Sequence, residues 1–289
     1  MAARRIDTHF HVIPPDYSAW LRSRSIEAGG LALPEWSRDG ALATMDRFGI
    51  ETAILSVSTP GVHLGDDVEA RQWARTVNEY AADVVRSAPD RFGFFATLCL
   101  PDLDGSVVEL EHALDRLGAD GVVLLANSRG IYLGDRVLDP LFDELDRRRA
   151  RVFVHPSHLH GVEPLRGIPP FVADFLLDTT RAAIRLAGSG TLERCPNVEI
   201  ILSHAGGFVP YAAHRFAAVA SPRRDPADGI EQLRKFYFDT ALSGSPTAFP
   251  SLLAFAAPDH VLFGCDWPYA PDASVAYFTG MYESHVAAG

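Results

Sequence analysis

Cysteine is scarce in this sequence: the 289 residues include only three, at positions 99, 195 and 265. No two of them form a CxxC pair, which argues against a disulfide framework and against a zinc site built from thiolates. The sequence also has no run of about 18 apolar residues, so no transmembrane helix is predicted. The first residues, MAARRIDTHF, lack the apolar segment of a signal peptide. We therefore expect a cytoplasmic protein.

Positively charged residues are also fewer than negatively charged ones. The 26 lysine and arginine residues are outnumbered by 37 aspartate and glutamate residues, and the formal net charge is −11. Such a balance argues against binding to nucleic acid, whose phosphates require a basic surface, and against a polybasic membrane patch. Lysine is almost absent, since Lys235 is the only one. A small-molecule partner is the remaining expectation.

Short apolar segments recur along the chain and alternate with amphipathic ones. The apolar segments predict eight strands, at 4–10, 52–58, 92–100, 121–126, 151–156, 198–204, 236–241 and 261–266. Helices are predicted at 68–87, 105–117, 139–149, 176–189, 246–256 and 273–286. Eight strand–helix units in a chain of this length predict an α/β fold, a (β/α)₈ TIM barrel that spans residues 1–289 as a single domain.

An open doubly wound sheet is the alternative fold for this alternation. That fold normally has a glycine-rich phosphate loop after its first strand. The corresponding turn here reads HFHVIPPDY, which favours the barrel. Two loop insertions, at 12–39 after strand 1 and at 157–171 after strand 5, depart from the regular alternation. Both are expected at the C-terminal face of the barrel, where such loops form pockets.

Histidine and aspartate residues terminate several of the predicted strands. His9 and His11 end strand 1, His155 ends strand 5, His204 ends strand 6 and Asp266 ends strand 8. Side chains two apart on a strand point the same way, so His9 and His11 stand side by side. The carboxyl ends of barrel strands meet at the catalytic face. Three imidazoles and one carboxylate there predict a zinc-like site with an open coordination position.

Other roles for these residues stay open at this stage. Asp266 could orient a ligand rather than bind the metal, and His204 could be a fourth nitrogen ligand or a general acid/base. His63, His158 and His160 lie in loops, where they are either solvated or in contact with substrate. Lys235 precedes a predicted strand, so neither a bridging carbamylated lysine nor a Schiff base is expected. One metal ion is favoured over two.

Four motifs, DTHFH, VFVHP, ILSHAGG and FGCDWP, occur in this order. Together they resemble the amidohydrolase-superfamily decarboxylases related to aminocarboxymuconate-semialdehyde decarboxylase. The segment GGFVPYAAHRF is most similar to enzymes of the 6-methylsalicylate decarboxylase type. The resemblance implies one divalent metal, usually Zn²⁺ with Mn²⁺ as the alternative, held by His9, His11, His155 and Asp266.

The same resemblance implies further roles. His204 would be an acid/base residue. Arg215 would either bind the substrate carboxylate, in some members across a subunit interface, or lie as an ordinary arginine on a helix surface. The proton donor is either Asp266, which we favour, or His204. A homodimer or homotetramer is therefore expected. Phe10 and Trp267 either form a wall against the substrate ring or pack in the core.

The expected reaction is non-oxidative decarboxylation, with release of CO₂, of a small aromatic acid that is salicylate-like, such as 6-methylsalicylate. An ortho-hydroxybenzoate can chelate a metal through its phenolate and one carboxylate oxygen, and the metal would act as Lewis acid and template. The alternative is metal-dependent hydrolysis of an amide, a lactone or a C–C bond in a small molecule, which would use the same open site.

Overall fold

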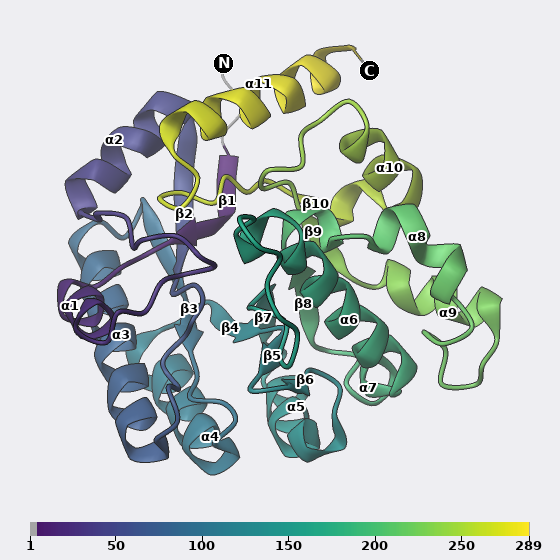
Figure 1. Cartoon of the computed structure of the whole chain (residues 1–289), viewed down its shortest axis with the longest axis horizontal. Coiled ribbons are helices and arrows are strands. Elements are labelled where there is room, and N and C mark those ends of the chain that lie inside the picture. The colour runs from purple at the N-terminus through teal and green to yellow at the C-terminus, as the bar shows by residue number, and fades with distance from the viewer. Residues whose placement is uncertain (1–4, 289) are drawn as a thin grey trace.

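The barrel predicted from the alternating segments is present in the computed structural model, which describes residues 5–288 (Figure 1). Its main sheet has eight strands in the order β1-β2-β3-β4-β7-β8-β9-β10, and the paired strands are parallel. These are β1 (Arg5–His11), β2 (Ile50–Ser56), β3 (Phe92–Thr97), β4 (Gly121–Leu125), β7 (Arg151–His155), β8 (Glu199–Leu202), β9 (Tyr237–Asp239) and β10 (Val261–Leu262).

The sheet closes where the segment after β10 meets β1. Two parallel bridges join Asp7 to Phe263 and Phe10 to Trp267. The amide of Asp266 donates to the carbonyl of His9 at 2.8 Å. Closure therefore brings the first and the last strand of the chain together, and with them the DTHFH and FGCDWP motifs.

Helices surround the sheet (Figure 1). They are α1 (Pro15–Ser23), α2 (Arg38–Phe48), α3 (Asp67–Ser87), α4 (Leu103–His112), α5 (Asp139–Arg147), α6 (Asp174–Gly188), α7 (Thr191–Arg194), α8 (Val209–Phe216), α9 (Pro226–Arg234), α10 (Ala248–Phe255) and α11 (Asp272–Ala288). Several begin at side-chain caps: Ser37 accepts from the amide of Gly40 at α2, and Asp66 accepts from Glu69 at α3. Within residues 5–288, no helix combines the length and the apolar character needed to cross a bilayer.

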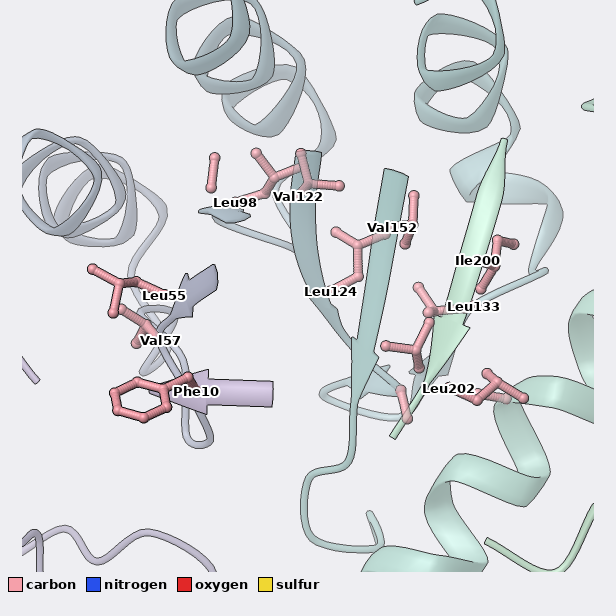
Figure 2. Close-up of a cluster of buried hydrophobic side chains, with 14 of the residues drawn as sticks. Phe10, Leu55, Val57, Leu98, Val122, Leu124, Leu133, Val152, Ile200 and Leu202 are labelled. Carbon is pink, nitrogen blue, oxygen red and sulfur yellow. The ribbon is translucent and has the colours of Figure 1, made fainter. Parts of the chain in front are cut away.

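Alternate residues of the strands enter two different apolar clusters. Val122, Val152 and Ile200 belong to the large cluster between sheet and helices, part of which Figure 2 shows. The intervening residues are buried in a smaller cluster inside the barrel, formed by Phe95, Val123, Phe153 and Ile201. Because strand side chains alternate between the two faces, the residue two positions after Phe153 also points inward. That residue is His155.

The strands end earlier than the sequence predicts. The predicted strands 198–204 and 261–266 stop at Leu202 and Leu262, so His204 and Asp266 lie in turns beyond them rather than at strand ends. Both residues have positive φ, 53° and 64°, which a β-strand does not accommodate. The predicted strand 52–58 is shifted to 50–56, and residue 4 of the predicted first strand lies outside the described residues.

The two predicted insertions border the carboxyl ends of the strands as expected, but they differ in structure. Segment 12–39 contains the short helix α1, which the sequence interpretation missed because its prolines were read as loop signals. Pro15 occupies the first turn, where a helix tolerates proline. Segment 157–171 has no helix before a 3₁₀ turn at Pro170–Val172. The interpretation also missed α2, α7, α8, α9 and the hairpin of β5 (Asn127–Ser128) and β6 (Ile131–Tyr132).

Candidate active site

Four buried side chains at the carboxyl ends of the strands form a potential metal centre. His9, His11, His155 and Asp266 each offer one ligand atom, and these four atoms lie within 4.8 Å of one another. His9 and His11 come from β1 and His155 from β7, whereas Asp266 comes from the turn after β10. The structure therefore brings together all four residues that the sequence predicts as ligands.

The orientation of the imidazoles fits a cation. Each ring has its Nδ1 atom within hydrogen-bond distance of an acceptor oxygen: His9 with Asp239 Oδ2 at 2.7 Å, His11 with the Ser56 carbonyl at 3.1 Å, and His155 with the Pro156 carbonyl at 2.8 Å. If Nδ1 carries the proton, Nε2 carries a lone pair. The Nε2 atoms of His9 and His11 are only 3.1 Å apart. Two lone pairs at this distance repel unless a cation lies between the rings, so this donor set suits a divalent metal.

The electrostatics of the cluster also call for positive charge. Burial lowers the pKa of His11 and holds that of His155 well below its usual value, so both rings are neutral electron-pair donors. Burial opposes charge on His9 as well, but the carboxylates of Asp239 and Asp266 raise its pKa to about 10. Two carboxylates thus flank one buried imidazole. A bound metal ion would supply the charge that they require.

Asp266 connects the metal centre to His204. Its Oδ1 atom lies 3.0 Å from His11 Nε2 and 3.2 Å from His9 Nε2. Its Oδ2 atom lies 3.5 Å from His204 Nε2. Burial would raise the pKa of Asp266, but the neighbouring imidazoles of His9 and His11 hold it well below its usual value. The Nδ1 atom of His204 is buried without a hydrogen-bond partner among the described residues.

A large cavity opens next to this cluster. It has a volume of about 1040 Å³ and is lined by His155, His204 and Asp266. The rest of its lining is mostly apolar, and much of it is aromatic: Phe171, Phe175, Phe208, Tyr211, Tyr269 and Phe278. Both insertions contribute, the first through Ala28, Leu31 and Pro34 and the second through Phe171. An apolar chamber with a few convergent polar groups is typical of a site for a small molecule.

The sequence matches the family described as Amidohydrolase over residues 6–281. The chain belongs to this amidohydrolase family. It is 38% identical to the decarboxylase macB of Penicillium terrestre over 99% of this chain and 90% of that protein. It is also 38% identical to the 6-methylsalicylic acid decarboxylase of Penicillium expansum, over 97% and 90% of the two chains.

A solved structure of a similar protein agrees with the fold. The crystal structure of 2,6-dihydroxybenzoate decarboxylase in complex with 2,6-dihydroxybenzoate superposes with a TM-score of 0.74 and 25% identity. The match covers 96% of this chain and 91% of that one. Family membership and barrel thus agree with the resemblance stated from the four motifs.

Three residues predicted to contact the substrate lie away from the cavity in this amidohydrolase. Phe10 is fully buried and stacks on Trp267, with ring centroids 4.9 Å apart, and neither ring lines the cavity. The reason is alternation on β1, since Phe10 lies between two inward-facing histidines and points to the opposite face. Arg215 is exposed on the last turn of α8 and does not line the cavity either.

One residue of the candidate site was not identified from the sequence. Asp239 is completely buried at the end of β9, where it contacts His9 and also accepts from the amides of His204 and Ala241. It therefore holds both a metal-site histidine and the turn that carries His204. The signal was present in the sequence: the segment FYFD ends an apolar strand in an acid, as FGCD does.

Proposed function

We propose that this amidohydrolase is a metal-dependent carboxy-lyase that removes CO₂ from a small aromatic acid of the salicylate type, with 6-methylsalicylate as the first candidate. The observation that carries the proposal is the buried His₃Asp cluster beside an apolar, aromatic-lined cavity. The relatives named as decarboxylases support it. A flat, apolar ring with adjacent carboxylate and hydroxyl oxygens matches such a chamber in both polarity and shape.

The proposal assigns His9, His11, His155 and Asp266 to a single divalent metal. We favour Zn²⁺ because three of the four donors are imidazole nitrogens, and Mn²⁺ is the alternative. When bound, the ion supplies Lewis-acid chemistry to oxygen atoms of the acid. Elemental analysis of the purified protein, followed by reconstitution with each metal in turn, tests both the stoichiometry of one and the identity of the metal.

The side chains of the site would then control the transfer of one proton to the substrate. In the reaction, a proton is added to the ring carbon that bears the carboxylate, the bond between that carbon and the carboxylate breaks, and its electron pair restores the aromatic ring as CO₂ leaves. Asp266 and His204 both line the cavity and lie 3.5 Å apart, so a proton can pass between them. We assign the donor role to Asp266, with His204 as its acid/base partner. Because the pKa of Asp266 is held well below its usual value, Asp266 would not store the proton but would pass on one that it receives from His204. The apolar lining would keep water away from the ring. The proton would then come from the positioned side chains and not from solvent.

Arg215 would anchor the substrate carboxylate from a neighbouring subunit. It follows Tyr211 by four residues on α8, and the side chain of Tyr211 lines the cavity. Since Arg215 does not line the cavity of its own chain, its action requires a homodimer or homotetramer. Light scattering should give such a mass, and Arg215→Gln should raise KM for the acid while exposed Arg136→Gln leaves it unchanged. A monomer with unaltered KM in the variant would contradict the assignment.

The decisive experiment is a substrate panel. The metal-loaded protein is incubated with 6-methylsalicylate, salicylate, resorcylates and, in parallel, with esters, lactones and amides. We expect CO₂ release from at least one ortho-hydroxybenzoate and none from protein stripped of metal. Turnover of the hydrolysable compounds without decarboxylation of any acid would favour the alternative, hydrolysis.

A further inference from the structure

A second cavity, here called the side cavity, lies behind the wall of the active site. It has a volume of about 290 Å³ and is bounded by the ends of β3 and β4 and by the loops after β2 and β7. Along the loop after β2, Val57 and Pro60 line the side cavity, whereas Ser58 and Thr59 between them line the active site. No described residue lines both cavities. The two chambers are therefore separate sites.

Two side chains that line the side cavity carry buried polar atoms without a partner. The hydroxyl of Thr97 has none, although the Thr97 backbone is fully engaged by Asn78 at 2.8 and 2.9 Å. Thr97 as a whole is only 5% exposed. The Nδ1 atom of His63 is likewise unpartnered, while its Nε2 atom is 2.8 Å from Asp67. When the proton is on Nε2, His63 Nδ1 is a hydrogen-bond acceptor without a donor.

A positively charged side chain lies at the rim of the side cavity. Arg129 lines it, is exposed, and forms no ion pair or hydrogen bond with any residue in the range 5–288. Its backbone has φ of 53°, and Gly130 after it has φ of 89°, as in the central positions of a type I′ hairpin turn. Arginine is an uncommon residue there, because the left-handed conformation costs about 1–2 kcal/mol for a side chain larger than glycine.

The wall of the side cavity is preorganised by one buried carboxylate. Asp178, which is fully buried, accepts from Asn127, from the hydroxyl of Tyr132 and from the amide of Ser157. These contacts tie the β5–β6 hairpin to the segment after β7. The side cavity is thus formed by the fold itself, and its remaining lining, which includes Leu98, is largely aliphatic.

We propose that the side cavity is a second binding site for a small organic acid that carries a hydroxyl group, such as a hydroxybenzoate. Its hydroxyl would donate to His63 and accept from Thr97, its apolar body would lie on the aliphatic lining, and its carboxylate would pair with Arg129 at the rim. Each of the three otherwise unused groups thereby gains a partner of complementary chemistry. The inference does not rest on the proposed decarboxylation, since it concerns binding at a separate cavity.

Binding of 3-hydroxybenzoate tests this assignment. Its hydroxyl and carboxylate are not adjacent, so it cannot chelate a metal as an ortho-hydroxybenzoate can. Titration of the metal-loaded protein, followed by calorimetry or ligand-observed NMR, should show binding that Arg129→Gln weakens by about tenfold or more. Arg116 serves as the matched control, because it is an exposed arginine in the π-helical turn Ala113–Leu117 and does not line the side cavity. Arg116→Gln should leave the affinity unchanged.

Thr97→Val gives the second readout, because valine keeps the shape of threonine and removes only the hydroxyl. Wild-type protein should bind 3-hydroxybenzoate more tightly than benzoate, and this preference should shrink in the variant. Absence of binding up to about 10 mM, or binding that neither variant alters, overturns the proposal. The readout is affinity, so a failed decarboxylation assay leaves this result interpretable on its own.

Discussion

Asp266 presents its two carboxylate oxygens to different partners, and this division would let one residue serve both of the roles proposed for it. Oδ1 faces the imidazoles of His9 and His11, and Oδ2 faces His204. The left-handed backbone at Asp266, with φ of 64°, aims the side chain this way. Aspartate is among the residues that tolerate that conformation. The geometry of a single turn thus links the candidate metal site to His204, the proposed acid/base partner of Asp266.

At the same scale, Asp239 should control metal affinity without touching the metal. Asp239→Asn weakens the hold on His9 Nδ1, so the ring loses its fixed tautomer and orientation. We expect the affinity for Zn²⁺ to fall by about 10–100-fold, measured by competition with a chelator. Asp228→Asn, a change on α9 remote from the site, is the control. Equal affinities in both variants would show that Asp239 has no positioning role.

His204 should behave differently from the metal-site histidines. His204→Gln is expected to retain one metal per chain but to lower kcat by roughly 10²–10⁴-fold, as for loss of a general acid/base. His9→Ala, by contrast, should lose the metal. Metal content by elemental analysis, read beside kcat, separates the two roles. If His204→Gln also loses its metal, then His204 is a ligand.

At the scale of elements, close helix packing makes one glycine indispensable. A Cβ atom at Gly229 of α9 would lie 1.7 Å from the carbonyl oxygen of Ala217, so α8 and α9 could not approach as they do. A Cβ atom at Gly280 in α11 would have no atom within 4 Å apart from its own stretch of helix. We expect Gly229→Ala to lower the free energy of unfolding by about 1–3 kcal/mol or more. Gly280→Ala should raise it by about 0.5–1 kcal/mol.

Urea denaturation of the two glycine variants provides the measurement, and each serves as the control for the other. The same substitution should thus have opposite signs in two helices. Stabilisation by both changes would mean that α8 and α9 are not in the contact described.

The end of α5 should contribute an acid-sensitive stability. Arg147, together with Arg148, lowers the pKa of Glu144 from 4.5 to about 2. A carboxylate whose pKa is lower in the folded state stabilises the protein above the unfolded value, and this contribution is lost as pH falls from about 4.5 to 2. Glu144→Gln should therefore cost about 1 kcal/mol near pH 7 and progressively less below pH 4.5. Exposed Glu111→Gln is the control in the same pH series of thermal melts, and a cost independent of pH would contradict the ion-pair origin.

At the scale of the whole molecule, the metal site joins distant parts of the chain, because its ligands come from β1, β7 and the turn after β10. Ligand binding to the folded state alone stabilises it by mass action. A chelator should therefore lower Tm by roughly 5–10 °C relative to protein with metal at about 100 times Kd, and added Zn²⁺ should restore it. His9→Ala should not respond to either treatment. An unchanged Tm in the wild type would argue against a metal that bridges these elements.

The sequence alone determined the barrel and the candidate ligands, because both depend on local patterns. Alternating apolar and amphipathic segments report which surfaces must be buried, and strand periodicity places His9 and His11 on one face. Histidines after the apolar segments VFV and IILS marked the catalytic end of the barrel. These features need no knowledge of which segments meet.

Only the tertiary structure decided contacts between distant segments. It paired Asp239 with His9, placed Phe10 and Trp267 in the core, left Arg215 outside the cavity, and ended two strands before His204 and Asp266. It also separated the side cavity, with unpartnered Thr97 and His63, from the active site. These outcomes depend on the closure of the sheet and on left-handed turns. Both arise from packing between residues far apart in sequence, so no local sequence pattern predicts them.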